Sequence, residues 1–549
     1  MPLQKNQILT LRIERLSSDG SGVAHSADGE AVFVPGTAPG DEARVRIVKD
    51  CGRYAFGILD ELLTPSPDRV SVDCPVAGPC GGCSLRHLDY AAELRAKQES
   101  VLDAFRRIGG LEVPVLDILP SPDADRYRNK VQFPVGIDKN GVPCIGFYAG
   151  RTHRIVPCPD CKLQPSVLNE IGNALCAFFA QQGIRPYDEQ SGKGLVRHIF
   201  LRRGAHSGQI MVCLVCTRAK LPHAEQLCTA LRGQFPAIST ILLNVNAKST
   251  NVILGSENHI LYGPGYIEDT LCGVPVRLGP LSFYQVNTLA AERLYGVAAQ
   301  YAQLTPDDTL LDLYCGMGTI GLSMAEQCRE LIGVEIVPEA IESAKANAAR
   351  MGEAVAAKSR FFCADAGQAA TQLAAEGLHP DIVMLDPPRK GCDEATLSAV
   401  VRMAPHRVVY VSCNPATAAR DAAWLEKNGY HTEKVQPVDL FPRTKHCETV
   451  VLLSKGEIDS KKVRVEFSLE DMDMSGFQKG ATYEQIKAYV LEHTGLKVSS
   501  LYISQIKRKC GLDVGQNYNL SKKEDAKVPK CPPEKEAAIR DALKYFQMI

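Results

Sequence analysis

The sequence predicts an α/β protein whose main domain is a Rossmann-like, doubly wound sheet. Between residues 308 and 453, short apolar runs alternate with helical stretches. The six runs are residues 310–313, 332–335, 360–363, 382–385, 407–412 and 450–453. This order of strand and helix is typical of a mostly parallel sheet with ligand sites at the carboxyl ends of its strands. Two further observations complete the fold class. Short strand-like segments before residue 65 indicate an N-terminal β-barrel, and a charge-rich tail beyond residue 460 indicates a small C-terminal helical extension.

The length of 549 residues fits about three or four domains. We place the barrel in residues 1–66, a central α+β domain in residues 67–275, the doubly wound domain in residues 276–456 and the extension in residues 460–549. No run approaches the roughly 20 apolar residues of a membrane span, and the first residues lack the apolar core of a signal peptide. We therefore expect a cytoplasmic protein without a membrane partner.

The net charge of −1 argues against a molecule that binds nucleic acid over its whole surface. A nucleic-acid partner would instead have to meet local basic patches. The candidates are residues 106–107, 126–130, 197–203 and 507–509.

The first strand-like segments are residues 9–13, 31–34, 42–48 and 55–62, with turn signals at Asp19-Gly20 and Asp28-Gly29. They predict a five-stranded barrel of the oligonucleotide-binding type. A barrel without any ligand would show the same pattern, so a ligand is not implied by these segments alone.

The central domain opens with a helix. Residues 90–109 have an amphipathic pattern that ends at Gly109-Gly110, and we expect this helix to pack on the doubly wound domain. Strand-like segments at 199–202, 210–216 and 240–246 then alternate with helical segments at 163–181 and 224–235. In the tail, residues 482–494 and 499–509 flank Gly495, and they predict either a helix-turn-helix with a basic second helix or an ordinary helical hairpin.

The chain has 20 cysteines, and without a secretory signal they point to metal binding or catalysis more than to disulfides. Cys74, Cys80 and Cys83 have the spacing Cys-x5-Cys-x2-Cys. A fourth ligand must come from farther along the chain, where Cys161 is the best candidate and Cys158 its rival. Four thiolates suit a four-iron cluster, and zinc uses the same ligands, so the spacing leaves the metal open.

A Gly-rich loop follows the first strand of the doubly wound domain. Gly316, Gly318 and Gly321 spell GxGxxG, and Glu335 stands at the end of the next strand. Glycines let the backbone approach a ligand, and the carboxylate can accept hydrogen bonds from two ribose hydroxyls. The motif suits a dinucleotide and S-adenosylmethionine equally, because both contain adenosine.

The apolar strand 382–385 is followed by Asp386-Pro387-Pro388-Arg389 at the carboxyl edge of the sheet. Enzymes that methylate exocyclic amines place an aromatic residue after the two prolines, so Arg389 disfavours that chemistry.

A thiol and a carboxylate follow farther along the chain. Cys413 comes directly after a strand, in Ser412-Cys413-Asn414-Pro415, and Glu448 closes Lys445-His446-Cys447-Glu448. Carbon 5 of uracil is a poor nucleophile until a group adds to carbon 6, and a thiolate is well suited to that addition. These residues therefore suggest covalent chemistry on a bound base, with Cys315, Cys392 and Cys447 as rival nucleophiles.

Together these motifs resemble the bacterial 23S rRNA (uracil-5-)-methyltransferase family, whose relatives include the tRNA uracil-5-methyltransferases. The resemblance covers roughly residues 5–455. It includes a barrel similar to a TRAM domain, the cysteine set, Tyr127-Arg128-Asn129-Lys130, Phe283-Tyr284-Gln285-Val286-Asn287, the Gly-rich loop, Asp386 to Gly391, Ser412 to Pro415, and Asp439-Leu440-Phe441-Pro442 leading to Glu448.

The resemblance implies S-adenosylmethionine-dependent methylation of uracil C5 in RNA, most directly 23S rRNA. It makes Cys413 the nucleophile and Glu448 the base, and Cys447 a bystander. It assigns cofactor contacts to Gln285, Tyr314, Glu335 and Asp386, and a four-iron, four-sulfur cluster to Cys74, Cys80, Cys83 and Cys161. The central domain would then carry the cluster and bind RNA. We expect a monomer with no obligate protein partner.

Three alternatives remain open at this point. A tRNA uracil-5-methyltransferase shares the catalytic motifs, but those enzymes usually lack the barrel and the cysteine set. An NAD-dependent oxidoreductase with an iron–sulfur centre would explain the Gly-rich loop, but it leaves Arg389, Cys413 and Glu448 without a role. A non-catalytic RNA-binding factor would not need Cys413 and Glu448. The role of the tail beyond residue 460 lies outside the resemblance.

Overall fold

The computed structural model describes residues 3–150, 152–248, 251–456, 483–494, 496–510 and 531–545. It divides the chain into two compact units, Met1–Ile458 and Asp459–Ile549. Among the helices in the described ranges, none combines the length and the apolar character that crossing a membrane requires.

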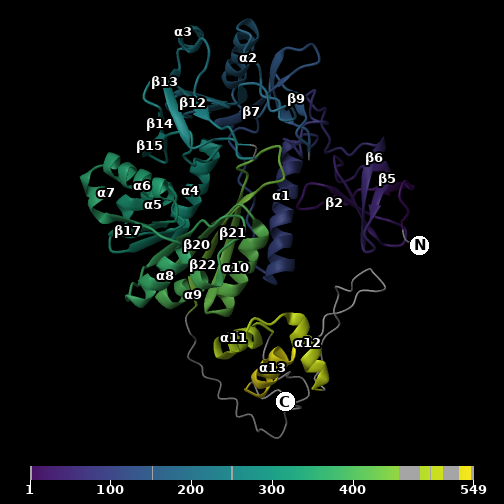
Figure 1. The fold of residues 1–549 in the computed structure, drawn as a ribbon, viewed down its shortest axis with the longest axis vertical. Coiled ribbons are helices and arrows are strands. Elements are labelled where there is room, and N and C mark those ends of the chain that lie inside the picture. Colours follow the sequence, from purple (N-terminus) through teal and green to yellow (C-terminus); the bar gives the residue numbers. More distant parts are fainter. Residues whose placement is uncertain are drawn as a thin grey trace. The chain divides into compact units, whose positions relative to one another are not determined.

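The N-terminal domain is a single six-stranded sheet, drawn in purple in Figure 1. Strand β5 alternates between exposed and buried positions, and Ala43, Val45 and Ile47 point into the core, as expected for a sheet with one solvated face. The predicted count of five strands is one short, because the two-residue β2 is too brief to show alternation. The strands are β1 (Ile8–Arg12), β2 (Arg15–Leu16), β3 (Gly22–His25), β4 (Ala31–Val34), β5 (Glu42–Asp50) and β6 (Tyr54–Thr64), in the order β1-β5-β6-β4-β3-β2.

Helix α1 (Tyr90–Ala104) runs alongside the doubly wound domain (Figure 1). It continues into a wider helical turn, η1 (Phe105–Gly109), and ends where Gly110 takes the left-handed conformation with φ of 65°. Val101 and Phe105 are fully buried against the apolar residues of α10 (Pro415–Lys427) and the neighbouring strands. This helix thus joins the central domain to the doubly wound domain.

The central domain contains a seven-stranded sheet with α2 (Ser166–Gln181) and α3 (Ala224–Gln234) packed against it. All seven residues of β11 are buried, which explains its unbroken apolar sequence. A separate hairpin of β14 (Ile267–Leu271) and β15 (Val274–Leu278) follows. The strands of the sheet are β7 (Lys130–Ile137), β8 (Pro143–Tyr148), β9 (Ile155–Pro157), β10 (Val196–Arg203), β11 (Ile210–Cys216), β12 (Ile238–Val245) and β13 (Glu257–Tyr262), in the order β13-β12-β11-β10-β7-β8-β9.

The doubly wound sheet is confirmed, with seven strands instead of the six that the sequence indicated. Five strands are parallel, and β22 runs antiparallel between β20 and β21. The additional strand β21 was missed because His431, Glu433 and Lys434 interrupt its apolar residues. The strands are β16 (Thr309–Leu313), β17 (Glu330–Glu335), β18 (Ser359–Cys363), β19 (Ile382–Leu385), β20 (Arg407–Ser412), β21 (Tyr430–Val438) and β22 (Glu448–Lys455), in the order β18-β17-β16-β19-β20-β22-β21.

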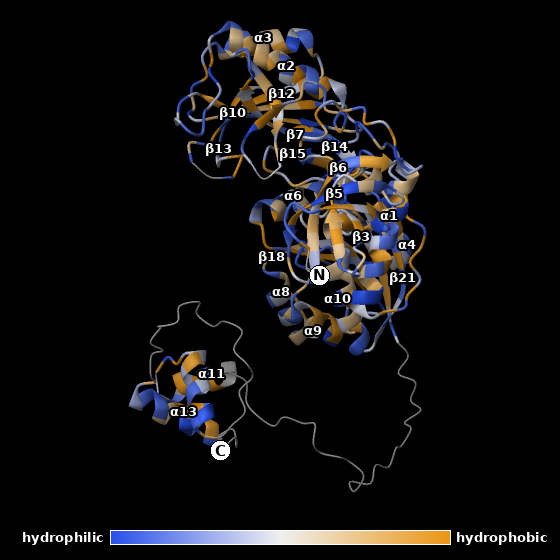
Figure 2. Cartoon of the chain, turned by 90° about the vertical axis from the view of Figure 1, so that its right-hand side faces the viewer, coloured by the Kyte–Doolittle hydropathy of each residue, from blue (hydrophilic) through white to orange (hydrophobic). Residues whose placement is uncertain are grey.

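Helices cover both faces of this sheet, so alternate residues of each strand enter different apolar layers. Leu310 belongs to one layer and Leu311 to the other. In Figure 2 the strands are mostly orange, whereas the helices carry blue segments as well. The helices are α4 (Thr288–Ala302), α5 (Thr319–Met324), η2 (Ala325–Gln327), α6 (Pro338–Met351), α7 (Glu353–Lys358), α8 (Ala366–Ala375), α9 (Glu394–Met403) and α10.

The C-terminal extension is helical, as predicted. Its described residues form α11 (Tyr483–Thr494), α12 (Ser500–Lys509) and α13 (Pro533–Tyr545). Ile486, Ile503 and Ile539, one from each helix, share a buried core. Helix α13 therefore completes a three-helix unit that neither the predicted helix-turn-helix nor the predicted hairpin included.

Candidate active site and cysteine cavity

The predicted catalytic residues meet at one edge of the doubly wound sheet. Asp386 follows β19, and Cys413 follows β20, which is the next strand in the sheet. In the antiparallel pair of β20 and β22, Ser412 lies opposite Thr449, so Cys413 and Glu448 continue the same register. Two residues 35 positions apart in sequence are thereby brought together by strand pairing.

The Gly-rich loop after β16 is tightly built. Gly316 and Gly318 have φ of 56° and 78°, the left-handed region that favours glycine. A Cβ atom on Gly321 would stand 2.8 Å from a carboxylate oxygen of Asp312. The backbone N–H of Gly316 donates to Glu335 Oε2 at 3.2 Å, so the acid at the end of β17 fixes the loop beside it.

The other predicted cofactor residues border this loop. Tyr314 also has a positive φ, 66°, and its hydroxyl lies 3.3 Å from Thr396 Oγ1. Gln285 precedes α4, and its carbonyl accepts a hydrogen bond from Asn129 Nδ2 at 2.7 Å. Non-glycine residues in the left-handed region are uncommon, and they often mark functional loops.

Tyr295 of α4 is a buried neighbour of this site that the sequence did not single out. Its hydroxyl lies 3.2 Å from Thr319 Oγ1. Burial raises the pKa of Tyr295, and the charge of Asp386 raises it further, whereas hydrogen bonds to Thr319 and Gln285 lower it. Tyr295 therefore lies near both Asp386 and the start of α5 at Thr319. An apolar helix pattern around it gave no signal of this position.

The buried carboxyl groups of Asp312 and Glu448 and the half-buried carboxyl of Asp386 lie near one another in the site. Burial raises the pKa of Asp386 to about 7. Burial, with the charge of Asp386 adding to it, raises the pKa of Glu448 to about 8, although Arg389 opposes the shift. Burial and the charges of Asp386 and Glu335 also raise the pKa of Asp312 to about 8. Groups that titrate near neutrality are suited to proton transfer.

Cys413 is the most accessible of the four candidate thiols. Cys315, Cys392 and Cys447 are buried, whereas Cys413 is half-buried. Burial and the charges of Glu448 and Asp386 raise the pKa of the Cys413 thiol, but the charge and a hydrogen bond of Arg389 lower it. Arg389 is therefore the group that favours the thiolate.

The loop that carries Arg389 is fixed to the start of α10. The Asn414 side chain accepts from Ala416 N at 3.2 Å, which caps the helix, and its Nδ2 donates to the Arg389 carbonyl at 3.0 Å. At the far end of the loop, Cys392 N donates to Asp421 Oδ2 at 2.8 Å. The residue after Cys413 thus positions the cation beside it.

In the central domain, the predicted cysteines surround a cavity of about 220 Å³. Both candidates for the fourth ligand line it, together with the basic side chains of Arg86 and Arg128. The five cysteines at the cavity are Cys74, Cys80, Cys83, Cys158 and Cys161. Within the described ranges, no three His, Cys, Asp or Glu side chains are close enough to bind a single metal ion.

The two late cysteines are chemically different. A hydrogen bond from Cys158, with smaller effects of the Leu163 N–H, Arg128 and Arg86, outweighs burial and lowers the pKa of Cys161 to about 7. The same hydrogen bond and burial raise the pKa of Cys158. Cys161 is thus the natural thiolate of the pair, and Cys158 its hydrogen-bond donor.

A seven-stranded, doubly wound sheet with an antiparallel last strand pair, a Gly-rich loop after β16 and an acid at the end of β17 define a class I methyltransferase fold. The chain belongs to the tRNA (Uracil-5-)-methyltransferase family, whose model matches residues 89–456. A TRAM domain model matches residues 2–59. The chain is therefore an RNA methyltransferase, and the NAD-dependent oxidoreductase alternative is wrong.

The chain is similar to proteins described as uncharacterized RNA methyltransferases. One from Halalkalibacterium halodurans is 43% identical over 453 residues, which cover 82% of this chain and 98% of the relative. Another from Clostridium tetani is 41% identical over 454 residues, covering 83% and 98%. Among solved structures, the Pyrococcus abyssi tRNA (uracil-54, C5)-methyltransferase in complex with S-adenosyl-L-homocysteine has a TM-score of 0.65 and 27% identity, covering 81% of this chain and 100% of that chain.

Proposed function

We propose that this enzyme methylates carbon 5 of a uracil in 23S rRNA through a covalent adduct on Cys413, with Glu448 as the base. The observation that carries the proposal is the pairing of β20 with β22, which sets the half-buried thiol against the buried carboxyl at the carboxyl edge of the sheet. Asp386 borders both groups, since its charge affects the pKa of each.

The reaction would begin with the target uracil turned out of its stack. The Cys413 thiolate adds to carbon 6, and the electron pair of the C5–C6 double bond moves onto the ring as an enolate. The methyl group that carbon 5 takes would come from the sulfonium of S-adenosylmethionine, whose S–CH3 bond breaks to leave neutral S-adenosylhomocysteine. Glu448 then removes the proton from carbon 5, the C6–S bond breaks, and Cys413 leaves as the thiolate.

The residues around the Gly-rich loop fit the methyl donor. Glu335 can accept from ribose hydroxyls, and Tyr314 directly precedes the loop. Asp312 Oδ1 is buried and has no hydrogen-bond partner in the described part of the chain. A buried carboxyl oxygen in that state is costly unless a donor reaches it. We therefore propose that Asp312 also contacts S-adenosylmethionine, at one of its polar groups. It joins Gln285, Tyr314, Glu335 and Asp386 as a cofactor-binding residue.

Cys74, Cys80, Cys83 and Cys161 are proposed to bind a four-iron, four-sulfur cluster. A zinc ion draws its sulfur ligands to about 2.3 Å from one point. The thiols instead surround a cavity of about 220 Å³, and this spacing suits a larger group. Arg86 and Arg128 would offset the thiolate charge.

The cluster assignment is tested on anaerobically purified protein. We expect broad absorbance near 400 nm with iron and sulfide in about equal amounts, as the cubane requires. Colourless protein with stoichiometric zinc would contradict it. Cys158→Ser should retain the absorbance and Cys161→Ser should lose it, because only Cys161 is proposed as a ligand.

The barrel offers a surface for RNA. Phe33, Tyr54 and Phe56 form a group on β4 and β6, with ring centroids 5.6 to 5.9 Å apart. Tyr54 and Phe56 are 41% and 36% exposed. Unpaired bases stack on exposed aromatic rings of such barrels. This group supports a single-stranded RNA region as the partner.

The second candidate substrate is tRNA. The resemblance of the sequence motifs favours ribosomal RNA. The similarity to a tRNA enzyme along that enzyme's whole chain favours tRNA. Methylation of 23S rRNA and tRNA transcripts, followed by mass mapping of 5-methyluridine, distinguishes them. Methylation of tRNA alone would contradict the ribosomal substrate.

A further inference from the structure

The loop of residues 439–447 joins β21 to β22 and delivers Glu448 to the active site. Its central residue, Arg443, has a φ of 67°, so the backbone is in the left-handed region there. A loop with such a residue keeps its conformation only when its surroundings specify it. The groups that surround this loop therefore decide where Glu448 stands.

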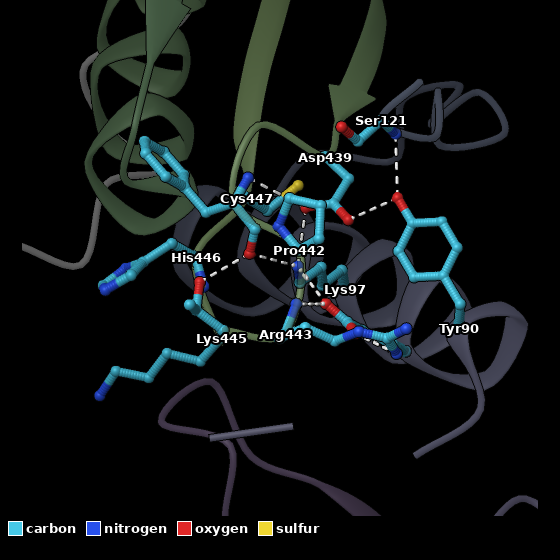
Figure 3. A network of polar contacts seen from close by, with 12 residues as sticks. Tyr90, Lys97, Ser121, Asp439, Pro442, Arg443, Lys445, His446 and Cys447 are labelled. Atoms are coloured by element: carbon cyan, nitrogen blue, oxygen red, sulfur yellow. Dashed lines mark hydrogen bonds and ion pairs between the residues drawn. The ribbon is translucent and has the colours of Figure 1, made fainter. Parts of the chain in front are cut away.

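Lys97 of α1 is one of these groups, and it is 3% exposed. Its ammonium donates to Glu93 Oε1 at 2.7 Å, to Asp439 Oδ1 at 2.7 Å and to the Phe441 carbonyl at 3.1 Å. These contacts employ all three N–H donors of the ammonium group. Two of them reach the loop, which begins at Asp439 (Figure 3).

The two carboxylates that bind Lys97, Glu93 and Asp439, make further hydrogen bonds that fix the loop. Glu93 Oε1 also accepts from Arg443 N at 2.7 Å, in the middle of the loop. Asp439 Oδ2 accepts from the Tyr90 hydroxyl at 2.9 Å, and the Tyr90 hydroxyl oxygen in turn accepts from Ser121 N at 2.9 Å (Figure 3). The side chains of Glu93 and Asp439 are fully buried.

A second set of contacts fixes the other side of the loop. The Pro442 carbonyl accepts from the Tyr127 hydroxyl at 3.0 Å. The Arg443 carbonyl accepts from Leu85 N at 3.1 Å, and Lys445 N donates to Ser84 Oγ at 2.9 Å. The loop thus lies between α1 and the segment that follows Cys83.

The buried charges are paired. Lys97 lies against Glu93 and Asp439, and the Arg443 guanidinium lies 3.8 Å from Glu93 and 3.5 Å from Asp125. A buried ion pair is often no more stabilising than apolar residues of the same size, but it specifies one arrangement. Here the ion pair also binds backbone groups of Phe441 and Arg443. It therefore specifies the conformation of the loop.

We propose that Lys97 is a positioning residue that sets Glu448 against carbon 5 of the adduct. This inference rests on the proposed role of Glu448 as the base. The Lys97 ammonium donates its hydrogen bonds to Glu93, Asp439 and Phe441, so it acts on the loop and not on the nucleophile or the Gly-rich loop. Its loss should therefore slow proton removal and release of the enzyme, and should leave addition of Cys413 nearly unchanged.

The test is a single-turnover reaction of the full chain with radiolabelled 23S rRNA and tRNA transcripts and S-adenosylmethionine. Covalent protein–RNA adduct is followed on a denaturing gel. For Lys97→Met we expect adduct formation within about threefold of wild type and release slower by about 10²-fold, the effect of roughly 1 Å of misplacement. Tyr90→Phe, which removes one hydrogen bond to Asp439, should slow release in the same direction to a smaller extent.

Lys358→Met is the control. It removes a cation whose ammonium donates to the Cys328 carbonyl at 2.8 Å, just before β17 and so at the sheet edge opposite the active site. It should lower stability without slowing release. If Lys97→Met does not fold, the rate at which Tyr90→Phe releases the adduct tests the proposal in its place.

The outcomes separate the two claims. Adduct that accumulates with Glu448→Gln but is released at the wild-type rate by folded Lys97→Met and Tyr90→Phe would overturn the role of Lys97 alone. Normal turnover by Cys413→Ala and Glu448→Gln would instead overturn the proposed function.

Discussion

Replacing Glu448 by Gln removes the proposed base and one buried charge with little change in volume. The pKa of Glu448 rises from its usual value of 4.5 to about 8, because burial and the charge of Asp386 disfavour ionisation. Between these values the folded protein keeps a proton that the unfolded chain has lost. The free energy of unfolding of the wild type should therefore fall as pH rises from 5 to 8.

The variant has no such proton, so its stability relative to wild type should increase with pH. Each pH unit between the two pKa values corresponds to about 1.4 kcal/mol. Across the interval from pH 5 to 8, the difference in the free energy of unfolding should change by on the order of 3 kcal/mol in favour of Glu448→Gln.

Urea unfolding of the two proteins at several pH values measures this difference. Glu353→Gln is the control, because Glu353 is exposed and should follow wild type at every pH. The same Glu448→Gln protein, mixed with RNA and S-adenosylmethionine, should accumulate a covalent adduct. Parallel stability curves would refute the buried, protonated carboxyl. If Glu448→Gln turns over at the normal rate without accumulating adduct, Glu448 is not the base.

Two further substitutions test the neighbouring groups. Arg389→Met should raise the pKa of the Cys413 thiol, because Arg389 lowers it by charge and by a hydrogen bond. Adduct formation at pH 7 should then slow by about tenfold and recover as pH rises. A rate of adduct formation that does not depend on pH would contradict this. Tyr54→Ala with Phe56→Ala should raise KM for RNA by about tenfold or more with kcat nearly unchanged, since stacking contributes about 1–3 kcal/mol per base; an unchanged KM would remove the aromatic surface from the account.

The sequence predicted the fold where apolar strands are continuous. The strand 382–385 has the predicted bounds, and β20 begins and ends as predicted, because both are buried on two faces and read as unbroken apolar runs. Strand β21 lies nearer the edge and mixes polar with apolar residues, so periodicity alone did not reveal it.

The sequence likewise predicted the site residues that stand in local motifs and missed those that depend on distant contacts. Cys413 and Glu448 were found because each stands in a short motif at the end of a strand. Lys97 was not, because Glu93 and Lys97 are four residues apart on a helix, and such a pair usually indicates an exposed face. Its burial depends on Asp439, 342 residues farther along the chain, and no local pattern contains that contact.

The covalent step on Cys413 is the central claim, and mass spectrometry of the trapped adduct tests it most directly. Enzyme and RNA are reacted with S-adenosylmethionine, quenched and digested, and the modified nucleoside and the cross-linked peptide are identified together. We expect 5-methyluridine as the product and an RNA link on the peptide containing Cys413, with neither formed by Cys413→Ala. A methyl group at another position, a link at Cys315, Cys392 or Cys447, or full turnover by Cys413→Ala would contradict it.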